Sequence, residues 1–341
     1  MGEMIPLYGF GGKSGRAAST LTITAPVGAT VTVSKDGKSK PSKVATTGTV
    51  VFKSLETGTW TITITNGTDT ASKTVEIKAD YQAAISFNTI PEFTYTGDFE
   101  IVSDDDQPIT VSQGNWKIRF LTSGTLTFTN LNGAENGIDI FLVGGGAGGG
   151  RAAGGGGYTK TLKAVKVSVG TAYLIEVGAG GIAGVGNGKA GSAGGTSNAF
   201  GASANGGKAN GTASFVGSDG GSGGGAGSAN GAGGKGGSDG SDGFNRYGTH
   251  IDSGTGQGTT TREFGESGGK LYAGGGGGCS TSSSKGGSGG AGGGGSGGNT
   301  SGGATSGETN TGGGGGGAAN NKAGGSGGSG IVVIRNAREV A

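Results

Sequence analysis

Few residues of this chain could carry out acid–base or nucleophilic chemistry. His250 is the only histidine and Cys279 is the only cysteine. A Ser/His/Asp triad would have to use His250, but glycine surrounds it and no nucleophile-elbow pattern is present. A histidine or cysteine metal site would need more than one such residue within the chain. We therefore predict a protein that is not an enzyme and that needs no cofactor.

Glycine-rich motifs that cradle phosphates give no stronger signal. The pattern G-x-G-x-x-G recurs from Gly144 onward, but chance explains it in so glycine-rich a segment, and no helix follows it. The Walker pattern is absent, because Leu7 stands where Gly12-Lys13-Ser14 would require the first glycine. Three adjacent carboxylates, Asp104 to Asp106, could recruit Ca²⁺, although a charged turn between strands is the favoured interpretation.

One segment gathers the side chains that recognition uses. Between Phe244 and Tyr272, aromatic, amide and charged residues replace the surrounding glycine. Such groups on a rigid scaffold are typical of saccharide or protein-surface binding. In the alternative interpretation, Phe264 and Tyr272 fill the edge of the glycine region. The predicted receptor-binding residues are Arg246, Tyr247, His250, Arg262, Phe264 and Tyr272.

The scaffold that would position these residues has an unusual composition. Only 15 of the 89 glycines precede Gly144, which leaves 74 in the last 198 residues, about 37 %. Average proteins contain about 7 % glycine. All five prolines lie before this region, and its glycines occur in runs rather than at every third position, so collagen is excluded.

Charge and hydropathy exclude other classes. The net charge is +2, and no basic stripe of the kind that nucleic-acid binding requires is visible. No stretch approaches 18 apolar residues, so no membrane insertion is expected. The first ten residues contain no apolar run of signal-peptide length, so release by lysis or assembly is expected rather than secretion.

The glycine-poor part predicts a small β-sandwich. Apolar residues alternate with threonine over residues 21–79, as in Trp60-Thr61-Ile62-Thr63-Ile64, and turn residues such as Asn66-Gly67 separate the short runs. Residues 1–20 are either a frayed terminus or an attachment arm that orders on a partner. Residues 80–93 are predicted to be a linker.

Residues 94–341 are predicted to form a glycine-rich domain. Strands are expected within 97–143, and a hairpin is expected to join Val165–Val169 to Tyr173–Val177. The apolar run 331–335 is expected to return and pair beside Ile138–Val143. That pairing would make residues 144–330 a single connection between two paired strands. So long a connection without order is uncommon in compact domains, so we expect it to be ordered.

Glycine can form left-handed extended helices of the polyproline II type, with three residues per turn. Their N–H and C=O groups point outward in three directions, so adjacent helices can satisfy one another. Such packing requires glycine wherever two helices meet and excludes proline from bonded faces. We therefore predict an all-β fold, a small β-sandwich followed by strands and packed polyglycine II helices.

The segments "FLVGGGAGGG", "GTAYLIEVGAGG", "GQGTTTREFGESGGKLYAGGGGG", "NTGGGGGG" and "GGSGIVVIR" resemble the glycine-rich domain of phage and prophage tail proteins. The segment "NWKIRFLTSGTLTF" resembles the strands that precede that domain, so the resemblance covers about residues 91–341. The run "APVGATVTVSKDGK" through "GTWTITITNG" resembles small sandwiches of the PEGA and carboxypeptidase-regulatory type. The glycine-rich resemblance implies a polyglycine II scaffold whose loops at one end contact bacterial receptors.

This resemblance implies a virion protein that acts as a host-attachment adhesin. Expected partners are a bacterial cell-surface glycan or protein and, through the N-terminal region, other tail proteins; a homo-oligomer is possible. The expected location is the phage tail, extracellular after host lysis. The alternative is a purely structural or ice-interacting protein without a receptor. Ice-binding faces favour regular small residues, whereas eight aromatic residues follow Gly144.

Overall fold

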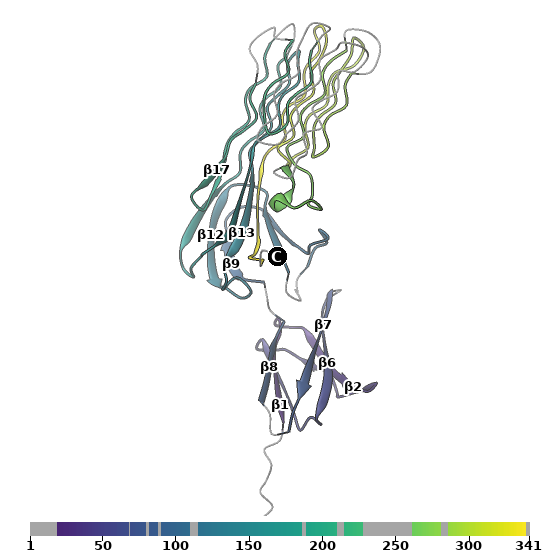
Figure 1. Ribbon diagram of the computed structural model, residues 1–341, viewed down its shortest axis with the longest axis vertical. Helices are drawn as coiled ribbons and strands as arrows, with labels where there is room; N and C mark the ends of the chain where they lie inside the picture. The colour runs from purple at the N-terminus through teal and green to yellow at the C-terminus, as the bar shows by residue number, and fades with distance from the viewer. Residues whose placement is uncertain are drawn as a thin grey trace, which may run out of the picture. The chain divides into compact units, whose positions relative to one another are not determined.

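The structure is a computed structural model that describes residues 19–67, 69–79, 82–87, 90–109, 115–185, 189–209, 215–227, 261–280 and 286–338 (Figure 1). The chain forms two compact units, one of residues 1–89 with 110–114 and one of residues 90–109 with 115–341. Among the described residues, no helix is long and apolar enough to span a membrane. The predicted arm 1–20 lies outside the described residues apart from its last two positions.

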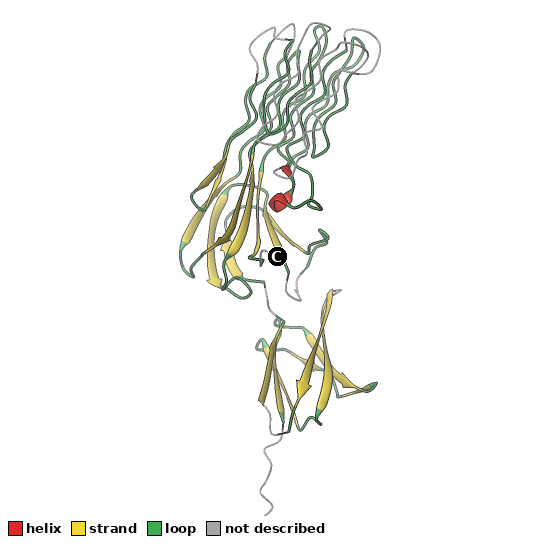
Figure 2. Ribbon diagram, viewed as in Figure 1, coloured by secondary structure: helices red, strands yellow, loops and turns green. Residues whose placement is uncertain are grey.

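The N-terminal unit contains two sheets that face one core (Figure 2). One sheet has the order β5-β1-β8, the other has the order β3-β2-β6-β7, and β4 pairs with β2. Alternate residues such as Leu21, Val31 and Ile62 are fully buried, as period-two patterning predicts. The strands are β1 (Thr20–Thr24), β2 (Thr30–Lys35), β3 (Lys38–Ser39), β4 (Lys43–Val44), β5 (Thr49–Lys53), β6 (Gly58–Asn66), β7 (Asp69–Ile77) and β8 (Gln82–Ser86).

The predicted linker 80–93 differs from the structure. Within it, β8 pairs in parallel with β1 and so belongs to the N-terminal unit. Ala83 of this strand is buried, and Phe87, which follows the strand, is buried as well. The run is short, and alanine at two of its five positions weakens the strand pattern. The end of the same range begins β9 (Glu92–Tyr95) of the second unit.

The second unit begins with two five-stranded sheets, in the orders β10-β11-β18-β13-β14 and β17-β16-β15-β12-β9. Side chains between them form one apolar core around Trp116, Phe120 and Phe128, all fully buried. The remaining strands are β10 (Phe99–Val102), β11 (Lys117–Phe120), β12 (Gly124–Asn130), β13 (Ile138–Val143), β14 (Thr159–Val165), β15 (Ala172–Glu176), β16 (Ser197–Ala199), β17 (Ala202–Ala204) and β18 (Ile331–Asn336).

The predicted return of the last strand is confirmed. β18 lies antiparallel between β11 and β13, and Val143 pairs with Ile331. The predicted hairpin is wrong: β14 pairs with β13 in one sheet, whereas β15 pairs with β12 and β16 in the other. The alternation of residues 165–169 follows β14 instead, as the chain crosses between sheets.

Beyond the sheets, the glycine segments run side by side as extended chains (Figure 1). In segment 144–150 the backbone N–H group turns to a new neighbour at each residue and returns to the same neighbour at every third residue. This is the three-residue period of polyglycine II. The donor–acceptor pairs, all at 2.8–3.0 Å, are Gly144–Tyr158 and Ala147–Gly155, Gly145–Gly195 and Gly148–Ser192, and Gly146–Gly328 and Gly149–Gly325.

The carbonyl groups of segment 144–150 accept from three further neighbours. The donors belong to segments 178–184, 205–207 and 312–318, so this helix has six neighbours. Segment 312–318 is likewise bonded on six sides, to segments 144–150, 153–157, 273–280, 294–298, 303–308 and 324–330. The predicted polyglycine II packing is therefore a hexagonal lattice. The strands that precede and follow the glycine region in the sequence, β13 and β18, pair with each other in one sheet.

Edge helices explain the interruptions of the glycine pattern. Along segment 177–185 the residues repeat as buried, exposed and half-buried, and Gly178, Gly181 and Gly184 occupy the buried position. Ile182 and Val185 take the exposed position, at 75 % and 65 % exposure. A three-residue helix gives each side chain one of three directions, so only the direction that faces the lattice requires glycine.

Candidate functional site

The predicted recognition segment ends against a sheet. Residues 261–273 cover the outer face of the β10-β11-β18-β13-β14 sheet, where Phe264 and Tyr272 pack with Val143, Ile331 and Val333. The ring of Phe141 lies 6.0 Å from Phe264 and 5.4 Å from Tyr272, centroid to centroid. Phe264 is 3 % exposed and Tyr272 is 0 % exposed.

Beside these rings lies a partly buried charged cluster, which we define as Asp106, Lys117, Arg119, Asp139, Glu263, Glu266 and Arg335. β11 alternates so that Ile118 faces the apolar core and its two neighbours face outward. Lys117 Nζ lies 2.7 Å from Glu263 Oε2, and Arg119 Nη2 lies 3.4 Å from Glu263 Oε1. Asp106 pairs with both cations. Buried charges are tolerated when each has a partner, as here.

Arg335 of β18 forms the second half of the cluster. Its Nε donates to Asp139 Oδ2 at 3.1 Å, and its Nη1 donates to Glu266 Oε2 at 3.0 Å. Its guanidinium lies 4.1 Å from the centroid of the Phe264 ring, within the range of a cation–π interaction. Asp139, Arg335 and Lys117 share one level of the sheet, because the register pairs Arg335 with each of the other two residues.

These contacts shift the pKa values of the acids and of the tyrosine. The hydrogen bond from Arg335 lowers the pKa of Glu266 despite partial burial. Burial alone would raise the pKa of Asp106, but hydrogen bonds from Arg119 and Lys117 lower it overall. Burial raises the pKa of Tyr272 well above its usual value, and its hydroxyl donates to Glu263 Oε1 at 3.0 Å.

Two hollows border the segment. One, of about 420 Å³, is lined by residues of both signs, including Asp104, Lys117, Glu266 and Arg335. The other, of about 810 Å³, lies between Glu100, Arg119 and Arg262 on one side and the glycine turns 290–294 on the other. Because the buried acids of the cluster already pair with lysine or arginine, we assign the cluster to holding the segment on the sheet. The Asp104–Asp106 run is accordingly a charged turn, in which Asp104 pairs with Arg338.

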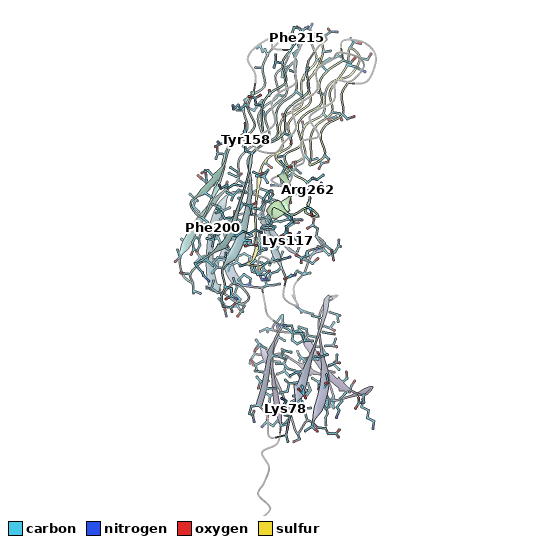
Figure 3. The ribbon with its side chains drawn as sticks, viewed as in Figure 1. Lys78, Lys117, Tyr158, Phe200, Phe215 and Arg262 are labelled. Carbon is cyan, nitrogen blue, oxygen red and sulfur yellow. The ribbon has the colours of Figure 1, made fainter. Side chains whose placement is uncertain are left out.

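A second candidate site lies at the end of the lattice away from the sheets. Arg151 occupies the turn between segments 144–150 and 153–158. Its guanidinium lies 4.6 Å from the ring centroid of Phe215, and Figure 3 places Phe215 at that far end. Arg151 Nε is buried and has no hydrogen-bond partner within the part of the chain that the structure describes. The side chain therefore retains a donor that no described group uses.

The structure describes three of the six predicted receptor-binding residues. Arg246, Tyr247 and His250 lie outside the described residues. Arg262 is half-buried near the sheets, where its Nη1 donates to the carbonyl oxygen of Gly269 at 3.3 Å (Figure 3). The side chains of Phe264 and Tyr272 are buried, so a receptor has no access to them. Their burial favours the alternative interpretation, in which they fill the edge of the glycine region. A receptor-binding role for the set stays a prediction.

Sequence reasoning missed both the charged cluster and the Arg151–Phe215 pair. A signal for the cluster was present, because "WKIRF" places two cations at alternate positions of an otherwise apolar strand and "IVVIRN" places one cation in another. Alternate charges on a buried strand indicate that its second face is covered by acids. The signal for the pair was Arg151, the only charged residue in the glycine-rich run 144–157. Its partner, 64 positions away, carried no sequence signal.

Comparison with known proteins supports the glycine-rich assignment. The family model described as a glycine-rich domain matches residues 121–337. This range includes β12 through β18 and the whole lattice. No curated protein matches the chain.

Proposed function

The chain belongs to the glycine-rich domain family, and from that premise we propose that it is a structural protein of a phage tail that binds a host receptor as an adhesin. In this proposal the lattice is the scaffold and its loops contact the bacterial surface. The N-terminal unit attaches the protein to other tail proteins. The protein acts on the virion, outside the cell after host lysis, without a cofactor.

The observation that carries this proposal is the hexagonal lattice itself. Its central helices are bonded on six sides, so the positions at which the chain reverses are held by many backbone hydrogen bonds. A loop on such a support loses little conformational entropy when it binds, and few contacts then suffice for affinity. The resemblance to tail proteins, which carry such loops to bacterial receptors, supports the same function.

The test is cell binding by the purified full chain, labelled with a fluorophore and measured by flow cytometry over a panel of bacterial strains. The double variant Arg246→Ala/Tyr247→Ala removes an arginine and an aromatic residue, the types that dominate interface energies. We expect at least about tenfold less adsorption, which corresponds to roughly 1.4 kcal/mol, and an unchanged melting temperature.

The matched control is Lys38→Ala/Val44→Ala, which removes one exposed cation and one exposed apolar side chain from the N-terminal unit. This control should bind cells as the wild type does. Wild-type levels of adsorption by the Arg246/Tyr247 variant would move the receptor face elsewhere. A wild-type chain that binds no strain but slows ice growth would instead establish the ice-interacting alternative.

A further inference from the structure

The far end of the lattice brings three cations together. Around the turn at Arg151, a Cβ on Gly150 would lie 2.5 Å from the carbonyl oxygen of Lys189, so these two chain segments adjoin. A Cβ on Gly324 would lie 2.1 Å from the carbonyl oxygen of Gly149, which places the turn containing Lys322 beside the same helix. Both lysines are exposed. We call Arg151, Lys189 and Lys322, with Phe215, the cationic tip.

Within the described residues, carboxylates lie away from the cationic tip. Asp219 adjoins Gly155, further along the lattice, and pairs with Lys208 at 3.7 Å. Glu308 lies toward the sheets, where it lines the larger hollow. The segments 186–188, 210–214 and 281–285 contain no Asp or Glu in the sequence. Three aspartates of segment 228–260 lie outside the described residues.

Arg151 is held in place for recognition. Its stacking on Phe215 orients the guanidinium plane, and the fork of N–H donors matches a carboxylate or phosphate group. The backbone at Phe215 is hydrogen-bonded as well, because its carbonyl oxygen accepts from the N–H of Gly227 at 2.8 Å. Next to it, Val216 is 43 % exposed and offers apolar surface for the face of a sugar ring.

We infer that the cationic tip binds an anionic polysaccharide of the cell surface, through the carboxylate or phosphate groups of that polymer. Arg151 supplies a planar two-point contact, and Lys189 and Lys322 supply point charges on either side of it. This inference rests on the proposed adhesin function and names the chemistry of its receptor. It adds a second contact surface, formed by residues outside the Phe244–Tyr272 segment.

The test measures binding of the full chain to immobilised alginate, a uronic acid polymer, and to poly(glycerol phosphate), with neutral dextran as reference. We expect binding to one or both polyanions that weakens as salt is raised, and no binding to dextran. The variant Lys189→Ala/Lys322→Ala should weaken binding about thirtyfold, on the scale of roughly fivefold per lysine near an anionic surface. Preference between the two polymers identifies the anionic group.

The matched control is Lys38→Ala/Lys40→Ala, which removes the same charge from two exposed lysines of the N-terminal unit. It should bind within twofold of the wild type. Arg151→Gln should also weaken binding. Because the turn at Arg151 joins two central helices, a change there also acts on the fold. The variant of the two exposed lysines therefore provides the test that does not depend on folding.

If the control and the lysine variant lost polyanion binding equally, the effect would depend on net charge alone, and the inference would be overturned. A chain that binds bacterial cells but neither polyanion would also overturn it, leaving the adhesin function and pointing to a protein or neutral-glycan receptor. A chain that binds neither cells nor polyanions would contradict both proposals.

Discussion

Gly314 has no room for even a methyl group. A Cβ there would lie 2.1 Å from the carbonyl oxygen of Gly154, a backbone atom that cannot turn aside as a side chain can. The segment around it is bonded to six neighbours, so relief on one side creates a clash on another. At this position glycine is required by space, and its conformational freedom is secondary.

We predict that Gly314→Val lowers the free energy of unfolding of the glycine-rich unit by more than about 3 kcal/mol, at or above the usual upper range for overpacking. The matched control is Gly268→Val, because nothing lies within 4 Å of a Cβ there. Denaturant titration followed by circular dichroism measures both variants. A Gly314→Val midpoint equal to that of the control would show that the run 312–317 is exposed.

The helices of the lattice differ from ordinary elements in where their hydrogen bonds go. Each is bonded entirely to other segments, often far away in sequence, as when Gly314 donates to Gly274 and Gly317 donates to Gly277. No helix of this kind is stable alone, because polyglycine II has no internal bonds. The lattice therefore forms only when the sheets bring its segments together.

This interdependence predicts slow amide hydrogen exchange through runs of glycine. Protection should extend over Gly274–Gly278 and Gly312–Gly317, because most of these N–H groups donate to carbonyl groups of neighbouring segments. In contrast, Ser301 and Gly302 donate to the side chain of Asn299 in an exposed turn and should exchange faster. Mass spectrometry of peptic fragments measures both regions. Random-coil rates in the two glycine runs would contradict the lattice.

Over the whole molecule, the two units have separate apolar cores. The core of the N-terminal unit includes Trp60 and Phe87, and that of the second unit includes Trp116 and Phe128. The second unit adds a third cluster on the outer face of its sheet, around Phe141 and Tyr272. Because cooperative unfolding follows a shared core, each unit should unfold by itself.

We therefore predict two transitions in differential scanning calorimetry of the full chain. Gly314→Val should shift only one of them, whereas Trp60→Ala, which empties a buried site in the N-terminal unit, should shift only the other. Both transitions moving together in either variant would show that the two units are energetically coupled.

The all-β class, most strand positions and the chemistry of the glycine region follow from the amino-acid sequence alone. Alternation at Trp60–Ile64 marked a strand because every second side chain meets a core, and proline-free glycine runs indicated polyglycine II packing. The apolar run at Ile331 also predicted its own partner, because strands that end a long excursion gain most by closing it. These features are local or strongly patterned, so a single sequence carries them.

Which segments of the chain meet depends on tertiary contacts. Three features depend on partners far away in sequence. They are the path of residues 165–177 between two sheets, the burial of Phe264 and Tyr272, and the contact of Arg151 with Phe215. In the lattice this limit is severe, because nearly identical glycine segments could pair with any neighbour by local preference alone. Their order follows from the strands that begin and end the region and from the few positions, such as Ile182, that carry a large side chain and face outward.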